Sequence, residues 1–190
     1  SVRRDGYAIL NADDELVMAM RKQCDCKIAL FSLDENNRLV RQHCKLGGLA
    51  AIYENGFITI SKGEWKLRIE KAANVPLTYG GKAVFNIQNV LPAVLAAYVR
   101  GVKVEELREA LMTFVPSAAQ TPGRLNLFQF KQFQVVVDYA HNPHGFEALG
   151  KFLSKIPDSP KVGVIAGVGD RRDEDTVNLG RLSAQMFDEI

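Results

Sequence analysis

The stretch from Val135 to Leu149 constrains the fold of this chain more than any other, because one periodicity gives way to another within it. The β-branched run Val135–Val137 predicts a buried strand. Pro143 suits the first turn of a helix, since proline has no N–H group to leave unpaired there, and apolar residues then recur at helical spacing from Phe146. Strand, polar turn and helix in this order are typical of α/β sheets, which bind ligands outside the carboxyl ends of their strands.

The turn between this strand and this helix is rich in polar and aromatic side chains: Asp138, Tyr139, His141, Asn142 and His144. A carboxylate at a strand end can accept hydrogen bonds from ribose hydroxyls, and His141 could contact a phosphate or act near a reacting group. The same residues would also suit an ordinary loop in which Asn142 caps the helix. From the residues alone, both interpretations stay open.

Composition and charge restrict the class of protein. The 190 residues are 47% hydrophobic and 24% charged, which is ordinary for a globular protein with a sizeable core. The net charge of +2 gives no sign of a surface for nucleic acid or a membrane, and no apolar run approaches the roughly 20 residues that span a bilayer. Cys24, Cys26 and Cys44 lack the spacing of a zinc site and favour reduced thiols in the cytoplasm, and residues 1–5 do not resemble a secretory signal.

Strands and helices alternate in the first part of the chain. Residues 7–10 and 27–32 predict strands on either side of a helix, which Asn11 or Asp13 would cap. Asn55-Gly56 lies between two β-rich runs and is a strong hairpin signal.

A long helix is expected next, because apolar residues recur at three- and four-residue steps from about residue 87 to residue 98. Asn86 would cap this helix, and Pro92 would kink or interrupt it. A shorter helix is expected from about Val104 to Phe114. We therefore expect an α/β fold in this part of the chain.

Residues 115–123 are the best candidate for a linker, since they contain two prolines, a glycine and no periodicity. We therefore place a domain boundary near residue 121, which gives domains 1–120 and 121–190. Two β-rich runs between residues 125 and 137 then predict a hairpin-like pair.

Two amides and an arginine elsewhere in the chain could contact a nucleotide. Asn86 and Asn89 share one face of a helix start, and an amide matches the donor and acceptor edge of adenine. Arg124 follows the linker, where its planar fork of donors could bind a phosphate. Taken singly, each is better explained as a helix cap or a surface residue.

A charged loop follows Lys161–Ala166, which predicts another buried strand. Arg171 in this loop could bind an anion, and Asp170 and Asp173 could bind a cation. Gly167 and Gly169 lack the third glycine of the dinucleotide fingerprint. The simpler alternative is a solvated loop in which Asp173 or a neighbouring aspartate caps the next helix.

Taken in order, these motifs resemble those of the Mur ligase family of ATP-dependent amide ligases. The matching segments are Asn11–Asp14, Asn86–Asn89, Gly123-Arg124, Asp138–Phe146 and Gly169–Asp173. The resemblance implies an α/β fold in which residues 1–120 end the central ATPase domain and residues 121–190 begin a Rossmann-like C-terminal domain. The long His141–Phe146 form is most similar to the branch that joins arginine to the aspartate side chains of a polymer.

The resemblance also implies roles for individual residues. The residues expected around ATP are Asn86, Asn89, Arg124 and Asp138. His141 is the candidate for a catalytic residue. The candidates for substrate binding are Asn142, Asp170, Arg171 and Asp173, of which Asp170 or Asp173 would face the guanidinium of an arginine substrate.

In this family ATP phosphorylates a carboxylate, and an amine then attacks the acyl phosphate. ATP, arginine and an aspartate-containing polymer are thus the expected partners, with no nucleic acid and no membrane. Mg²⁺ is expected with ligands from outside this chain, and the full-length enzyme is expected to be a cytoplasmic homo-oligomer.

The chain departs from the family pattern in two respects. Phe85 occupies a position where the family often has histidine, and no glycine-rich phosphate loop is present. We therefore expect a fragment that does not turn over ATP alone. The alternatives are another ligase of this family, acting on peptidoglycan precursors or folylpolyglutamate, or a non-catalytic nucleotide-binding module.

Overall fold

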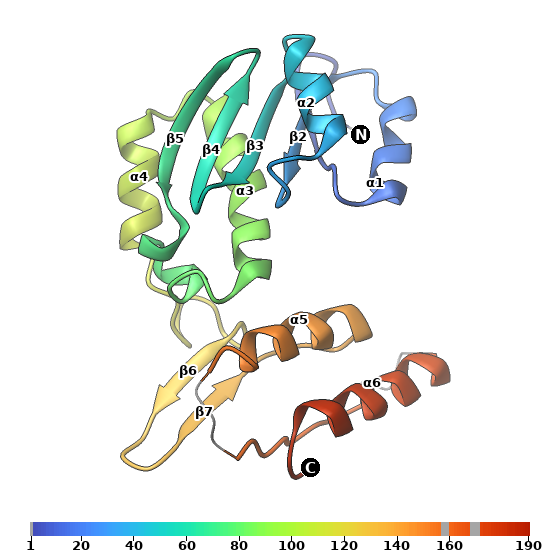
Figure 1. Cartoon of the computed structure of the whole chain (residues 1–190), viewed down its shortest axis with the longest axis vertical. Coiled ribbons are helices and arrows are strands. Elements are labelled where there is room, and N and C mark those ends of the chain that lie inside the picture. Colours follow the sequence, from blue (N-terminus) through green and yellow to red (C-terminus); the bar gives the residue numbers. More distant parts are fainter. Residues whose placement is uncertain (1, 157–159, 168–171) are drawn as a thin grey trace. The chain divides into compact units, whose positions relative to one another are not determined.

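The computed structural model describes residues 2–156, 160–167 and 172–190 (Figure 1). Its internal contacts divide the chain into two compact units, Ser1–Val115 and Pro116–Ile190. This division falls inside the segment 115–123 and a few residues before the boundary placed near residue 121. The two units are described separately below.

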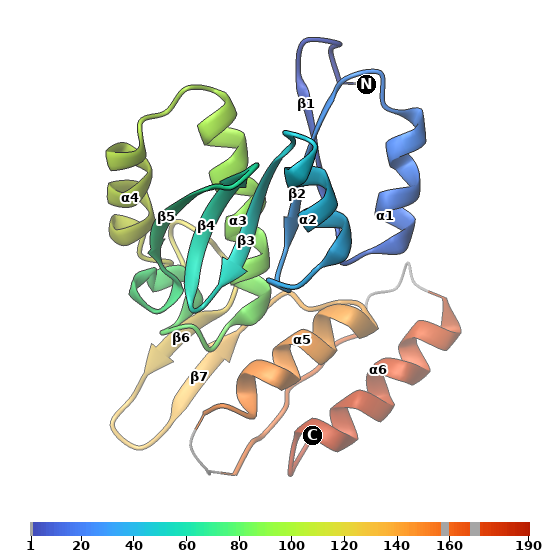
Figure 2. The same ribbon diagram turned by 45° about the horizontal axis from the view of Figure 1, so that its top comes forward.

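The first unit is built on a five-stranded mixed sheet with the strand order β1-β2-β3-β4-β5 (Figure 2). The strands β1, β2 and β3 are parallel, and β4 and β5 extend the sheet in antiparallel fashion. The strands are β1 (Tyr7–Asn11), β2 (Lys27–Ser32), β3 (Leu49–Glu54), β4 (Phe57–Lys62) and β5 (Trp65–Lys71).

Helices cover both faces of this sheet. Two hydrophobic clusters lie on opposite faces, one formed with α3 and α4 and the other with residues from α1 and α2. Ala29 and Leu30 are adjacent in β2 and are both fully buried, as expected for a parallel strand covered on both sides. The helices are α1 (Glu15–Ala19), α2 (Arg38–Lys45), α3 (Val84–Val99) and α4 (Val104–Thr113), with 3₁₀ turns η1 (Met20–Gln23), η2 (Ala72–Asn74) and η3 (Pro76–Thr78).

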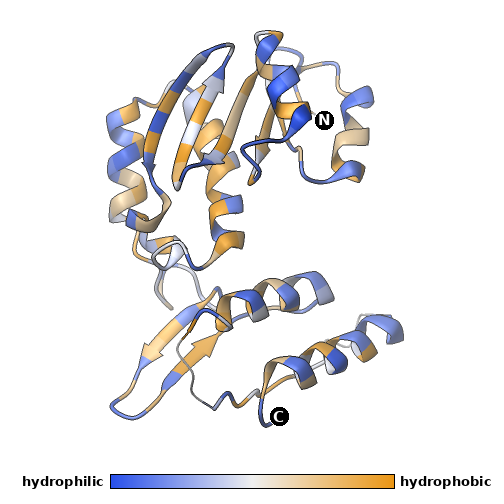
Figure 3. Ribbon diagram, in the orientation of Figure 1, coloured by the Kyte–Doolittle hydropathy of each residue, from blue (hydrophilic) through white to orange (hydrophobic). Residues whose placement is uncertain are grey.

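The structure confirms the predicted hairpin and corrects two details of the helices. Asn55 and Gly56 have φ angles of 50° and 81°, as a two-residue turn with positive φ at both positions requires. Asp14, and not Asn11 or Asp13, caps the first helix by accepting from two backbone N–H groups. α3 continues without interruption through Pro92, because burial of its apolar face (Figure 3) outweighs the cost of a proline.

The second unit contains an antiparallel hairpin and two helices that pack together. The hairpin confirms the prediction for residues 125–137. Gly150 on α5 faces Met186 of α6, whose methyl group would lie 2.8 Å from a Cβ atom at this position. The elements are β6 (Asn126–Gln129), β7 (Gln134–Val137), α5 (Pro143–Leu153) and α6 (Asp173–Met186).

Two predictions for the second unit are wrong. Lys161–Ala166 forms no strand beyond a single bridge from Val162 to Glu189, and Val164 is 99% exposed. The run Val135–Val137 is a strand, but two of its valines are exposed. A buried strand needs neighbouring strands and a covering layer. Val135–Val137 pairs only with β6 and keeps two exposed valines, and Lys161–Ala166 makes only the single bridge.

None of the helices that the structure describes combines the length and the hydrophobicity that a membrane-spanning helix requires.

Candidate functional site

Asp138 lies directly after β7 and links two loops of the second unit. One carboxylate oxygen accepts a hydrogen bond from the backbone N–H of Leu125 at 2.8 Å, and the other accepts from the N–H of Ala140 at 2.7 Å. The carboxylate thereby fixes the turn that precedes β6 to the turn that precedes α5. Each oxygen keeps further acceptor capacity, so Asp138 can still accept a bond from a ligand hydroxyl.

Arg124 is exposed on the turn that Asp138 holds. Its guanidinium carbon lies 5.5 Å from the centre of the Tyr139 ring, a distance at which the ring face attracts a cation. Gly123 and Leu125, on either side of Arg124, have φ angles of 67° and 49°. The left-handed backbone of Leu125 is unusual for a bulky residue, so the neighbouring bonds determine the conformation of this turn.

His141 and Asn142 lie at the start of α5. The Nδ1 atom of His141 is 3.0 Å from the Tyr139 carbonyl oxygen, and the two rings are 5.0 Å apart. The side-chain oxygen of Asn142 accepts from the N–H of Gly145 at 2.8 Å. Asn142 is therefore the helix cap that the simpler interpretation predicts, with Pro143 in the first turn. The His141 ring is oriented by the same turn that contains Tyr139.

The two asparagines of the first unit lie in different environments. Asn86 is the third residue of α3, and Ala83 occupies the cap position, so the prediction that Asn86 caps the helix is wrong. Asn86 is 8% exposed and donates to the Leu77 carbonyl at 2.8 Å. Asn89 is exposed one turn further along. Asn86 thus supports the segment before α3, while the amide of Asn89 is accessible to a ligand.

The predicted residues before α6 are only partly described. Asp170 and Arg171 lie outside the described residues. Asp173 is exposed as the first residue of α6, and Arg172 is the residue at the cap position, so an aspartate cap is not what the structure shows. Arg172 instead makes two bonds of 3.1 Å to Asp175, and this carboxylate raises the pKa of the Arg172 guanidinium.

A cleft of about 1060 Å³ lies at the carboxyl ends of β1 and β2. Asp13 lies in the wall of this cleft and is held there by three hydrogen bonds. Its carboxylate accepts from Ser32 Oγ at 2.6 Å, from the N–H of Leu33 at 2.8 Å and from Asn37 Nδ2 at 3.0 Å. The lining residues are Ala12, Asp13, Glu15, Met18, Leu33, Asp34, Asn36, Asn37, Arg38 and Leu39. The sequence motifs do not predict this cleft, although Asn37 before a helical run is a signal for the cap of α2.

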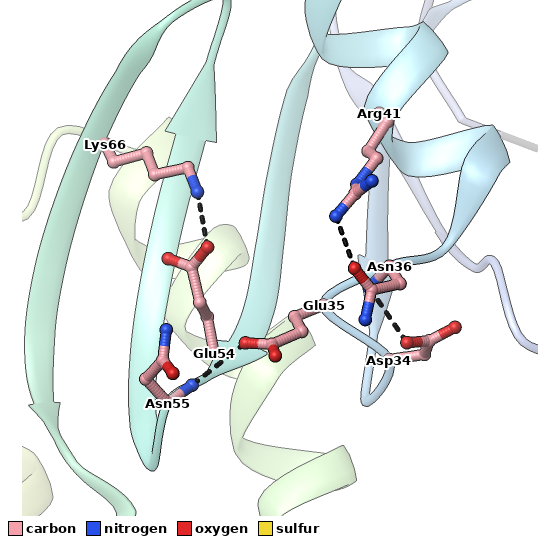
Figure 4. A network of polar contacts seen from close by, with 7 residues as sticks. All are labelled: Asp34, Glu35, Asn36, Arg41, Glu54, Asn55 and Lys66. Carbon is pink, nitrogen blue, oxygen red and sulfur yellow. Dashed lines mark hydrogen bonds and ion pairs between the residues drawn. The ribbon is translucent and has the colours of Figure 1, made fainter.

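The loop beside this cleft is held by polar contacts (Figure 4). These contacts join the loop after β2 to α2 and to the β3–β4 turn, so the loop has a defined conformation. They are Asp34 with Asn36, Asn36 with Arg41 and Glu35 with Asn55, beside an ion pair of Glu54 with Lys66. Within the described ranges, no group of three or more histidine, cysteine, aspartate or glutamate side chains could hold a metal ion.

Comparison with known proteins places these observations in a family. Residues 123–190 match the family model described as Mur ligase, glutamate ligase domain. This match agrees with the family that the motifs predict. The whole chain is 50% identical over 190 residues to cyanophycin synthetase of Trichormus variabilis and 51% identical over 190 residues to cyanophycin synthetase of Geminocystis herdmanii. It spans about a fifth of the length of these relatives, 21% and 22% respectively.

More distant relatives belong to the same family. The chain is 26% identical over 171 residues, 88% of its length, to the UDP-N-acetylmuramoyl-L-alanyl-D-glutamate–2,6-diaminopimelate ligase of Bacillus cereus, of which it covers 31%. A solved structure of a ligase of that name matches with a TM-score of 0.52 at 20% identity, covering 95% of this chain and 35% of the other. This structural likeness supports the α/β fold.

Proposed function

We propose that this chain is a segment of an ATP-dependent amide ligase of the cyanophycin synthetase type. The enzyme would join the α-amine of arginine to the aspartate side chains of a polymer. The supporting observation is 50% identity to cyanophycin synthetase over the full chain, against 26% over part of it to a diaminopimelate ligase. That difference favours the polymer ligase over the other amide ligases of the family.

The proposed reaction has two steps. An oxygen of the aspartate carboxylate attacks the γ-phosphorus of ATP, which forms an acyl phosphate and releases ADP. The arginine amine then attacks the acyl carbon, loses a proton and expels phosphate. Phosphoryl transfer of this kind depends on positioning and charge stabilisation more than on covalent chemistry, so the contribution expected of this chain is to hold the nucleotide and the amine.

The residues suited to a nucleotide are Asn89, Arg124 and Asp138. Asn89 presents an exposed amide, which has the donor and the acceptor that an adenine edge requires. The exposed Arg124 fork suits a phosphate, and Asp138 keeps acceptor capacity for a ribose hydroxyl. Asn86 would act indirectly, through its bond to the Leu77 carbonyl.

The residues proposed for the amine side are His141 and Asn142, with Asp170, Arg171 and Asp173. Asn142 uses its oxygen to cap α5, which leaves its amide N–H groups to face a substrate. The guanidinium of arginine requires acceptors or carboxylates around it, and Asp170 or Asp173 would supply one. Replacing both by asparagine should raise the KM for arginine. An unchanged KM would remove these two residues from the proposal.

Magnesium would accompany ATP and neutralise charge on its phosphates. We assign its ligands to parts of the full-length protein other than this chain. We also propose that the full-length protein is a homo-oligomer in the cytoplasm.

The substrate assignment can be tested by offering different amines to the purified full-length protein. ADP release in the presence of ATP, Mg²⁺ and an aspartate polymer should depend on arginine. Diaminopimelate and glutamate should leave the rate at its background value. Stimulation by one of those amines, with none by arginine, would indicate another ligase of the family. Nucleotide binding without any amine-dependent turnover would favour the non-catalytic module.

A further inference from the structure

Asn126 is a buried polar residue at the start of β6, and the sequence motifs do not account for it. It is 4% exposed and is the first residue of β6, where its backbone pairs with Val137. Its side chain turns back toward the preceding loop. The side-chain oxygen accepts from the N–H of Gly123 at 2.7 Å, and the amide nitrogen donates to the Thr121 carbonyl at 3.0 Å.

These two bonds close the turn that presents Arg124. The backbone N–H of Arg124 donates to the same Thr121 carbonyl at 3.1 Å, and the Gly123 carbonyl accepts from the N–H of Tyr139 at 2.7 Å. Asp138 holds the next residue, Leu125, by its N–H group. The residues on both sides of Arg124 are therefore fixed by bonds that do not involve the Arg124 side chain.

The conformation of the turn is one that the backbone would not adopt unaided. Gly123 and Leu125 have positive φ angles, and Leu125 is also buried, at 1% exposed. A bulky residue in the left-handed region is costly, so specific bonds have to compensate. Asn126 supplies two such bonds, to Gly123 and Thr121, and Asp138 supplies a third, to Leu125.

We propose that Asn126 is a positioning residue of the ligase, which sets the backbone of the Thr121–Leu125 turn so that the Arg124 guanidinium lies over Tyr139, ready for a nucleotide phosphate. The inference rests on the proposed function, because it assumes that Arg124 binds ATP. It adds Asn126 as a residue that would affect ATP binding only through the Arg124 side chain. Removing Asn126 should therefore matter only while Arg124 is present.

The test is a double-mutant cycle in the full-length protein with Asn126→Ala, Arg124→Ala and the combined variant. Asn126→Ala should raise the KM for ATP about tenfold, since two hydrogen bonds that fix the turn are lost. In the Arg124→Ala background the same change should raise it by no more than about twofold. Should Asn126→Ala fail to fold, Asn126→Asp keeps the acceptor for Gly123, exchanges the donor to Thr121 for a charged oxygen, and replaces alanine in the cycle.

Ser183→Ala is the matched control. Ser183 is also buried in the second unit, at 2% exposed, and donates to the Leu179 carbonyl on α6 at 2.7 Å. This variant should lower the thermal midpoint without changing the KM for ATP. An Asn126→Ala effect of equal size with and without Arg124, or no effect on KM in either background, would overturn the positioning role. Absence of ATP-dependent ligation in the wild-type protein would overturn the proposed function itself, and this inference with it.

Discussion

At the scale of single residues, the structure separates exposed side chains that a ligand could reach from buried side chains that hold the backbone. Asn86 and Asn89 form one motif in the sequence, yet one is buried and bonded to the Leu77 carbonyl while the other is exposed. In the second unit, the side chains of Asp138 and Asn126 likewise form hydrogen bonds to backbone groups. Spacing alone could not distinguish these roles, because it does not reveal the carbonyl at Leu77 or the N–H at Leu125 that each side chain meets.

Asn86→Ala and Asn89→Ala should therefore have different effects. Loss of Asn86 leaves the Leu77 carbonyl without its donor and should lower the free energy of unfolding of this chain by about 1–3 kcal/mol. Asn89 is exposed, and its replacement should change that free energy by no more than about 0.5 kcal/mol while raising the KM for ATP of the full-length enzyme. Urea denaturation and steady-state kinetics measure the two quantities. Equal losses of stability from both variants would contradict the division of roles.

His43 gives a residue-scale prediction about pH. Burial lowers the pKa of its imidazole, with a further contribution from the Arg21 charge. The unfolded chain therefore binds a proton at a higher pH than the folded chain does, so stability should fall as the pH drops below the ordinary histidine pKa of about 6.5. The urea midpoint should be lower at pH 5 than at pH 7.5. In His43→Asn that part of the pH dependence should be absent, and an unchanged pH profile would refute the assignment.

At the scale of elements, short sequence motifs correctly predicted turns and helix starts, because these depend on a few neighbouring residues. Asn55-Gly56 identified the hairpin because the turn requires positive φ at both positions, and Asn142-Pro143 identified the start of α5. The prediction of a buried strand at Lys161–Ala166 was wrong, because a β-rich run becomes a buried strand only when other strands pair with it and a further layer covers it. Helix α2 (Arg38–Lys45) was missed because its apolar face is short.

Replacing two of the glycines by alanine should change the free energy of unfolding in opposite directions. A Cβ atom at Gly48 would lie 2.3 Å from Nε2 of the buried His43 ring, where α2 meets β3. Gly48→Ala should therefore destabilise the chain by about 1–3 kcal/mol. Gly180 is exposed within α6 and has open space around its Cβ position, so Gly180→Ala should stabilise by about 0.5–1 kcal/mol. Urea denaturation of the two variants checks both signs, and a stabilising Gly48→Ala would show that the His43 ring moves away freely.

At the scale of the whole molecule, the alternation of strands and helices predicted the α/β class, and the division into Ser1–Val115 and Pro116–Ile190 lies in the segment expected to be a linker. Of the residues proposed to act on ATP, Asn86 and Asn89 lie in the first unit, and Arg124 and Asp138 lie in the second. The order of the motifs along the chain was enough to suggest the family, which the match at residues 123–190 confirms. Which amine the enzyme uses is a property of the full-length site and stays a proposal.

The most direct test of the central claim is the ATP-dependent incorporation of labelled arginine into insoluble polymer by the full-length protein, with and without Asp138→Ala. We predict incorporation that requires ATP and aspartate polymer and is lost in the variant, because Asp138 fixes the Arg124 turn and is the residue proposed to accept from the ribose of ATP. Circular dichroism of the variant serves as the control for folding. Failure of a well-folded wild-type protein to incorporate arginine would contradict the proposal that this chain belongs to a polymer ligase.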